Sequence, residues 1–153
     1  MEEVFYMTKN LIVRGAPQEY EIKENAWDSL PEHLYKRHID NVLILHGKTS
    51  WKAVKDDFPD LSITNFFEYY GGECTDPLAD SFVSLCKKKD FNGIIAVGGG
   101  KVADLGKLIA YKTNLPIIIL PTLAATCAAY TPLSVVYNEE GVMLRYDMLP
   151  KAN

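Results

Sequence analysis

Short apolar runs recur through the middle of the 153-residue chain. Residues 41–45, 93–97 and 116–120 are short, almost wholly apolar runs and contain many β-branched side chains, which predicts strands buried on both faces. A further strand is predicted over 62–69, where aromatic and β-branched residues precede a pair of glycines. Strands that are apolar on both faces are typical of a parallel sheet covered by helices.

Amphipathic segments separate these runs. Helices are predicted over 49–58 and 101–112, and a third begins at Asp76-Pro77, with Asp76 as N-cap. Alternating strands and helices predict a doubly wound, Rossmann-like α/β domain with a parallel sheet. Beyond Pro121 the pattern changes to two short strands, 134–138 and 142–146, around a turn at 139–141, which predicts a β-hairpin appended to the sheet.

The composition is that of one ordinary globular domain, because 48% of the residues are hydrophobic, 24% are charged and the formal net charge is -4. A mildly acidic chain without clustered Lys and Arg is not expected to bind nucleic acid. No apolar run approaches the roughly 18 residues of a membrane span, and residues 1–25 lack the features of a signal peptide, so we expect no membrane association and a cytoplasmic location.

The potential metal ligands are few and scattered. They are Cys74, Cys86, Cys127, His33, His38 and His46. The cysteines form no CxxC pair and the histidines have no i, i+4 spacing, so we expect reduced thiols and no metal site in this chain.

The most informative segment is the end of the strand at 93–97, where three glycines at 98–100 open directly into a helix. Glycines there leave backbone N–H groups bare at the positive end of the helix dipole, and Lys101 adds a positive charge, so we favour a pyrophosphate site over a turn that binds no ligand. A P-loop is excluded, because Ile95 stands in place of its first glycine and Val102 follows the lysine where Ser or Thr is needed.

Several motifs occur in a fixed order along the chain. They are Gly71-Gly72-Glu73-Cys74, Val97-Gly98-Gly99-Gly100-Lys101 with Asp104, Leu115-Pro116, and the segments 121–126, 133–137 and 139–141. Together, over about residues 12–153, they resemble the N-terminal half of the glycerol dehydrogenase branch of the iron-containing alcohol dehydrogenase superfamily.

The resemblance implies a domain that binds NAD(H) or NADP(H). The residues that it assigns to the cofactor are Gly98, Gly99, Gly100 and Lys101 at the pyrophosphate, Asp104 near the nicotinamide carboxamide, Thr122, Leu123 and Thr126 beside the adenosine, and Thr131, Leu133 and Tyr137 at the nicotinamide. Packing in the core or the hairpin is the alternative role for the apolar members, and bonding to the backbone of their own loop is the alternative for the first two threonines.

One departure from the family pattern concerns the choice of cofactor. Where the family usually has an acidic residue that binds the ribose 2′-hydroxyl of NAD, this chain has Gly47, flanked by His46 and Lys48. A carboxylate would repel a 2′-phosphate, so its replacement by glycine beside Lys48 favours NADP(H). The alternative is that Lys48 is an unoccupied surface lysine.

A second departure concerns the substrate. Cys127 stands where glycerol dehydrogenases have an aspartate associated with the polyol. A neutral thiol cannot accept hydrogen bonds from two hydroxyls as a carboxylate can, so glycerol is disfavoured and an anionic substrate is tolerated. The run 124–129 followed by Tyr130 resembles the hydroxycarboxylate dehydrogenases, which reduce 2-oxo acids with NADPH. A small buried filler is the alternative role for Cys127.

Members of the superfamily are roughly twice this long, and their C-terminal half supplies an aspartate and two histidines to a divalent metal, iron or zinc. No such motif precedes Asn153, so we expect residues 1–153 to be the cofactor-binding domain alone, inactive by itself, of an enzyme that is a homo-oligomer at full length. That enzyme would transfer hydride between the nicotinamide and a small alcohol or 2-oxo acid.

Two other classes of protein remain open at this stage. A nucleotide-binding regulatory domain without catalysis is compatible with the absence of an acid/base pair. A flavodoxin-like FMN carrier requires a Ser/Thr-rich phosphate loop after the first strand, and residues 46–50 match that pattern only weakly.

Overall fold

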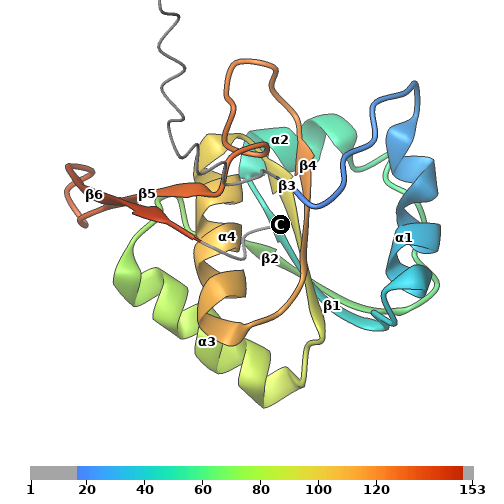
Figure 1. The fold of residues 1–153 in the computed structure, drawn as a ribbon, viewed down its shortest axis with the longest axis horizontal. Helices are drawn as coiled ribbons and strands as arrows, with labels where there is room; N and C mark the ends of the chain where they lie inside the picture. Colours follow the sequence, from blue (N-terminus) through green and yellow to red (C-terminus); the bar gives the residue numbers. More distant parts are fainter. Residues whose placement is uncertain (1–16, 150–153) are drawn as a thin grey trace, which may run out of the picture.

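The computed structural model describes residues 17–149, and its centre is a parallel sheet of four strands in the order β2-β1-β3-β4 (Figure 1). The strands are β1 (Asn41–His46), β2 (Thr64–Tyr69), β3 (Gly93–Gly98) and β4 (Ile117–Pro121). In the central pair, Leu45 lies opposite Ala96 and His46 opposite Val97. The four predicted strands and their parallel arrangement are thus confirmed.

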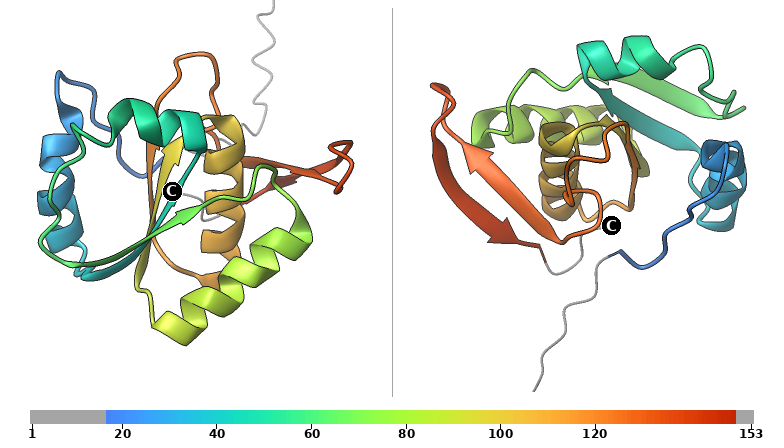
Figure 2. Two further views of the ribbon diagram at one scale, coloured as in Figure 1. Left: turned by 180° about the vertical axis from the view of Figure 1, so that it is seen from behind. Right: turned by 90° about the horizontal axis from the view of Figure 1, so that it is seen from above.

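Helices cover both faces of this sheet, as a doubly wound fold requires. On one face lie α1 (Leu30–Lys36), which follows the 3₁₀ helix η1 (Ala26–Ser29), and α2 (Lys48–Val54). On the other face lie α3 (Asp76–Lys89) and α4 (Gly100–Thr113). Figure 2 shows the sheet between the two helical layers.

The middle strands β1 and β3 form the core. All six residues of β3 are buried, and its alternate side chains enter different clusters: Ile94 and Ala96 pack with α3 and α4, whereas Ile95 and Val97 pack with α1 and α2. Each fully buried aliphatic side chain of this kind contributes roughly 1.5–3 kcal/mol of hydrophobic stabilisation. The ends of β1 and β3 are therefore rigidly held, and the loops that follow them start from fixed positions.

The predicted hairpin forms from β5 (Leu133–Tyr137) and β6 (Met143–Met148), but it is a separate antiparallel sheet. Figure 2 shows it on the α4 side of the molecule, away from the strands of the main sheet. Ser134 and Val136 of β5 are fully buried, whereas β6 is largely exposed. The hairpin is therefore appended through side-chain packing of β5 on α4 and not through strand pairing.

The helices depart most from the prediction in three respects. The residue that caps α3 is Thr75, whose Oγ1 accepts a hydrogen bond from the Leu78 amide at 3.3 Å, so Asp76 is the first helical residue and not the N-cap. Helix α2 ends at Val54, four residues earlier than predicted. The sequence analysis also missed α1, whose Leu30 and Leu34 are buried against the sheet.

Within residues 17–149 no helix is both long and apolar enough to cross a membrane.

Candidate functional site

The candidate site lies at the carboxyl ends of β1 and β3. The strand order reverses between these two neighbours, because the chain passes from β1 outward to β2 and then returns to the other side of β1 for β3. The helices that follow them, α2 and α4, consequently leave toward opposite faces of the sheet. Such a switch point opens a crevice beyond the strand ends, and this is where open α/β sheets bind ligands.

The turn from β3 into α4 offers unused backbone donors to this crevice. Gly99 is the N-cap of α4, in an extended conformation with φ -86° and ψ -165°, and its carbonyl accepts the first helical bond from the Ala103 amide at 3.1 Å. Gly98 uses its carbonyl to accept from the Thr122 amide at 3.1 Å. Within the described part of the chain no carbonyl occupies the Gly99 amide, and the first N–H groups of a helix have no intrahelical partner. These amides can therefore bind an anion.

The absence of side chains keeps the turn open. A Cβ on Gly98 would lie 2.7 Å from Cγ2 of Val102, and one on Gly100 would lie 3.3 Å from Oγ1 of Thr126. A Cβ on Gly99 would meet only the tip of Leu123, at 3.4 Å. Gly98 and Gly100 allow close packing of strand, helix and loop, whereas Gly99 faces the more open side of the turn.

Two buried hydroxyl oxygens flank the turn without hydrogen-bond partners among residues 17–149. They are Oγ of Ser50, on the first turn of α2, and Oγ1 of Thr122, just after β4. A Cβ on Gly98 would lie 3.3 Å from the Ser50 oxygen, so this hydroxyl faces the β3 turn from the neighbouring loop. Unsatisfied donors at three adjacent strand ends fit a polar, anionic ligand.

Lys101 is not the free cation that the sequence suggested. Its Nζ lies 2.6 Å from Oε2 of Glu73, and it sits 5.3 Å from the centroid of the Tyr137 ring. The hydrogen bond that Lys101 donates to the Glu73 carboxylate raises the pKa of the Lys101 ammonium, which keeps it charged. The Gly71–Cys74 segment is thereby attached to the start of α4, a role for Glu73 that sequence reasoning did not find.

Asp104 lies one turn into α4 and is only 7% exposed. Its Oδ1 forms an ion pair with Nζ of Lys107 at 3.0 Å, and its Oδ2 accepts a hydrogen bond from the Val135 amide at 3.2 Å. Burial raises the pKa of the Asp104 carboxyl and lowers the pKa of the Lys107 ammonium, while the attraction between the two charges opposes both shifts. The predicted contact of Asp104 with the carboxamide stays a prediction.

Sequence reasoning also missed Lys107, although a signal was present. Asp and Lys three residues apart, in a helix whose neighbouring residues are apolar, indicate a buried pair on one helix face. In the fold, all nine residues from Val102 to Ala110 are buried.

The loop between β4 and β5 brings most of the remaining predicted residues near the turn. Leu123 is 60% exposed beside Gly99. The Oγ1 of Thr126 accepts a hydrogen bond from the Ala128 amide at 3.1 Å, so this hydroxyl bonds to the backbone of its own loop, which was the alternative role predicted for it. Cys127 is exposed, and its carbonyl accepts from the Thr131 amide at 3.1 Å. Cys127 is therefore not the small buried residue that the alternative interpretation of it predicted.

The hairpin residues lie on the far side of α4's first turns. Leu133 begins β5 and is partly buried, and Tyr137 ends it. The Tyr137 amide donates to the Cys74 carbonyl at 2.8 Å, which ties the hairpin to the loop before α3. Tyr137 and Lys101 are thus in contact, and the assignment of both residues to one cofactor site stays a prediction.

Gly47 and Lys48 occupy the other side of the crevice. The Gly47 amide donates to the Val97 carbonyl at 3.4 Å, so the two glycine-containing turns are direct neighbours. Lys48 is exposed and holds its Nζ 4.9 Å above the ring of Tyr69, at the end of β2. The ammonium is therefore at the outer rim of the crevice, beyond the ends of β1 and β2.

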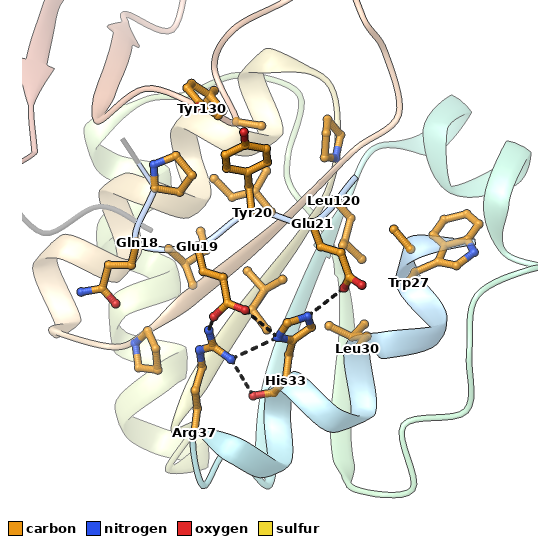
Figure 3. Close-up of a pocket in the computed structure, with 18 of the residues that line it drawn as sticks. Gln18, Glu19, Tyr20, Glu21, Trp27, Leu30, His33, Arg37, Leu120 and Tyr130 are labelled. Atoms are coloured by element: carbon orange, nitrogen blue, oxygen red, sulfur yellow. Dashed lines mark hydrogen bonds and ion pairs between the residues drawn. The ribbon is translucent and has the colours of Figure 1, made fainter. Parts of the chain in front are cut away.

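A large cavity of 1290 Å³ lies elsewhere, beside the outer edge of β4. Figure 3 shows its wall: Tyr20 meets Tyr130 edge-on, with ring centroids 5.3 Å apart, and Glu21 contacts His33 at 3.0 Å. Five residues of its lining, Leu123, Ala124, Thr126, Ala129 and Tyr130, belong to the loop between β4 and β5, and of these Leu123 and Thr126 lie beside the glycine turn. We place the candidate site at the turn, because the unused amides are there.

A metal centre does not fit the residues that the structure describes. Among residues 17–149 no three His, Cys, Asp or Glu side chains gather in a way that could hold an ion. Burial raises the pKa of the Cys74 thiol to about 12 and that of Cys86 to about 11, so both are poor metal ligands at neutral pH.

The fold and the turn together define a doubly wound α/β domain with a glycine turn at its switch point. Comparison with known families agrees. The chain belongs to the iron-containing alcohol dehydrogenase family, whose model matches residues 17–152. The resemblance stated from the sequence is thereby confirmed.

Individual relatives are dehydrogenases. The chain is 36% identical to a glycerol dehydrogenase from Thermotoga maritima over 111 residues, which are 65% of this chain and 30% of that protein. It is 48% identical to hydroxycarboxylate dehydrogenase A from Escherichia coli over 64 residues, which are 42% of this chain and 18% of that protein. Among solved structures, a probable glycerol dehydrogenase from Sinorhizobium meliloti 1021 superposes with a TM-score of 0.78 at 29% identity, covering 92% of this chain and 38% of that one.

The matched region is thus between 18% and 38% of each of these relatives.

Proposed function

We propose that this chain is the dinucleotide-binding part of an NAD(P)-dependent dehydrogenase that acts on a small alcohol or 2-hydroxy acid. The observation that carries the proposal is the set of unused amides at Gly99 and the start of α4, which are partly exposed at the switch point of the sheet. Backbone amides at a helix N-terminus bind phosphates without a charged side chain, and the glycines let the ligand approach them closely.

The described residues fit such a cofactor. The amides of Gly99 and Gly100 would hold the diphosphate, and the free hydroxyls of Ser50 and Thr122 would donate to it or to the adjacent ribose. Leu123, exposed beside the turn, would cover the adenosine. When bound, the nicotinamide supplies or accepts the hydride.

On the nicotinamide side, Lys101 has a supporting role. Its charge is already balanced by Glu73, so it contributes less attraction to the diphosphate than a free lysine would. Its contact with Tyr137 instead keeps β5 next to the turn. Thr131, Leu133 and Tyr137 would then form the wall against which the nicotinamide packs.

For the choice of cofactor we propose NADP(H) over NAD(H). The end of β1 has glycine and no carboxylate, and Lys48 holds a positive charge at the same rim. A ribose 2′-phosphate would find a cation there and no repelling charge. The exposed Cys127 in the β4–β5 loop, where a carboxylate would exclude an anion, supports a 2-oxo acid or 2-hydroxy acid as substrate.

We also propose that a divalent metal, iron or zinc, is held by residues outside 17–149, because no three His, Cys, Asp or Glu side chains within that range could hold an ion. The homo-oligomeric state and the cytoplasmic location stay predictions. Inactivity of the 153-residue chain by itself is likewise a prediction.

The test uses the 153-residue chain and one position, Gly99. A side chain fits there, because the nearest atom to a Cβ would be Leu123 Cδ1 at 3.4 Å and the backbone is extended. In Gly99→Asp the carboxylate would cap the helix amides itself and place a negative charge where the diphosphate belongs. We expect its affinity for NADPH and NADH, measured by calorimetric titration, to fall by at least about tenfold, the loss of one to two charge-assisted bonds.

Gly99→Asn is the matched control. It caps the helix equally well but adds no charge, so we expect an intermediate loss of affinity and unchanged thermal stability for both variants. Retained affinity in Gly99→Asp, or no binding of either dinucleotide by the unmodified chain at millimolar concentration, would refute the proposed function.

A further inference from the structure

The buried ammonium of Lys107 donates three hydrogen bonds to carbonyls of one chain segment. Its side chain is 0% exposed, and its Nζ donates to the carbonyls of Ala128 at 2.6 Å, Thr131 at 3.1 Å and Leu133. An ammonium has three protons, so each proton has a carbonyl acceptor, and Asp104 balances the charge at 3.0 Å. Every donor of this lysine is used within the protein, and none is available to a ligand.

Asp104 holds the next residues of the same segment. Its Oδ2 accepts from the Val135 amide at 3.2 Å, and its backbone carbonyl accepts from Oγ of the fully buried Ser134 at 2.8 Å. The Asp104–Lys107 pair on one helical turn therefore contacts the backbone or side chains of five residues between Ala128 and Val135. We call this stretch, residues 128–135, the anchored segment.

The anchored segment needs these contacts for its shape. From Ala128 to Pro132 it has no helix or strand of its own, so its inward carbonyls have no regular ladder to satisfy them. A buried lysine is costly and would be replaced by an apolar side chain of similar size if packing alone mattered. An apolar residue cannot bind three carbonyls at one point. The three hydrogen bonds of Lys107 do so, and they fix the backbone of the segment.

The position of the pair along α4 gives this shape a consequence. Gly100 begins α4, and Lys107 follows seven residues later, which is about 10 Å along the helix axis at 1.5 Å per residue. One rigid, buried helix therefore carries the glycine turn at its start and the anchor of the segment two turns further on. The proposed function assigns the first to the diphosphate and the segment's Thr131 and Leu133 to the nicotinamide.

We propose that Lys107, neutralised by Asp104, is a positioning residue: it sets the backbone of the anchored segment and so places the nicotinamide wall relative to the diphosphate turn, without touching the cofactor. This inference rests on the proposed function for its consequence in binding. Its structural part, the anchoring itself, can be tested independently.

The experiment compares Lys107→Met with Lys112→Met in the 153-residue chain. Both substitutions remove a charge from α4, but Lys112 is exposed and pairs with Asp80 at 2.7 Å on the surface. In Lys107→Met we expect amide hydrogen exchange of the anchored segment to accelerate by at least about tenfold, the loss of buried bonds, with β3 amides still protected. Lys112→Met should leave both regions unchanged.

The second readout is a pair of ligands that share the adenosine and the diphosphate. NADH carries the nicotinamide and ADP-ribose does not. We expect Lys107→Met to weaken NADH binding by about tenfold and ADP-ribose binding by less than about twofold, because only the nicotinamide wall has moved. A generally loosened domain would lose affinity for both ligands alike, so the ratio separates positioning from a merely structural role.

The outcomes distinguish failure of the role proposed for Lys107 from failure of the proposed function. Equal losses for NADH and ADP-ribose, or unchanged exchange in the anchored segment, would overturn the role of Lys107. Failure of the unmodified chain to bind either ligand would overturn the proposed function, while the exchange data would still decide the anchoring. If Lys107→Met does not fold, Ser134→Ala removes the hydroxyl that donates to the Asp104 carbonyl and also contacts Cys74 Sγ at 3.9 Å, and it should produce the same discrimination at about twofold. Equal effects on both ligands there would also refute the role.

Discussion

Two turns of the same local kind lie side by side in this domain, and they differ in what supports them. After β1 the chain passes through Gly47 into α2, and after β3 it passes through Gly98 and Gly99 into α4. Helix α2 has seven residues, none of them buried, whereas α4 has fourteen, of which nine are consecutively buried. Both turns meet at the Gly47–Val97 hydrogen bond.

The difference shows that two strand–glycine–helix turns of the same local pattern can be supported very differently by the rest of the fold. Short isolated helices are marginal in water, and tertiary packing provides most of the stability of a helix in a protein. The start of α4 is held by its buried face, so its amides keep their direction. Helix α2 is held mainly by the partly buried Trp51 and Val54, so its first turn is less firmly supported than that of α4.

The largest effect that separates the two turns is expected from adding one methyl group to each. In Gly98→Ala the new Cβ would meet Cγ2 of the buried Val102 at 2.7 Å and its Cβ at 3.0 Å, and a β-branched side chain cannot turn away easily. In Gly47→Ala the nearest atom is the Ser50 hydroxyl at 2.7 Å, which can rotate. We expect a loss of about 2 kcal/mol in unfolding free energy for Gly98→Ala and under about 0.5 kcal/mol for Gly47→Ala.

Chemical denaturation of the two variants measures this pair directly. Equal losses would mean that the β1 turn is packed as tightly as the β3 turn, and the comparison between them would fail.

A smaller effect concerns the α4 side of the sheet under alkaline conditions. Cys74 and Cys86 belong to the cluster that includes α4, and burial raises their pKa values from 9.0 to about 12 and about 11. Because the folded pKa of each thiol lies above the unfolded value, its stabilising contribution is complete below pH 9 and is lost as the pH rises toward 11–12. We expect a loss of about 1 kcal/mol per thiol between pH 9 and pH 10.

Cys86→Ala isolates one of the two thiols. Its unfolding free energy should fall less steeply than that of the unmodified chain over this interval, by about 1 kcal/mol. Parallel curves for the two proteins would show that Cys86 does not contribute to the alkaline loss.

The smallest effect is expected at the rim of the β1 turn. Lys48→Glu reverses a charge near the place proposed for the 2′-phosphate, at an exposed site where ion pairs contribute under about 1 kcal/mol. We expect the ratio of NADPH to NADH affinity to fall by about threefold to fivefold in parallel titrations. Tighter binding of NADH than NADPH by the unmodified chain would show the proposed cofactor preference to be wrong.

Much of the fold could be predicted because the strands are apolar at consecutive positions. The runs at 93–97 and 116–120 could lie only between two layers of helices, and the order of strands and helices then left few topologies. Helix α1 was missed because its apolar contacts are two residues, Leu30 and Leu34, in a segment of seven. The N-cap of α3 was misassigned because Thr75 and Asp76 are both good caps, and only the backbone geometry distinguishes them.

The backbone part of the candidate site, the amides of the glycine turn, could be predicted from the sequence. The hydrogen-bond and ion-pair partners of its side chains could not. Glycines before a helix indicate bare amides in any fold that places them after a strand. The partner of Lys101 is Glu73, twenty-eight residues away, and the acceptors of Lys107 lie twenty-one to twenty-six residues away. Such contacts depend on how separate elements pack.

The sequence by itself determined the parallel sheet, the glycine turn and the family, because hydrophobic periodicity and local motifs are properties of neighbouring residues. Only the tertiary structure decided that Lys101 is neutralised by Glu73, that the hairpin packs on α4 and not along the sheet, and that Lys107 is buried at the centre of a loop. The physical reason is that the free energy of a charge depends on its solvent exposure and its partners, and both are set by residues distant in the chain.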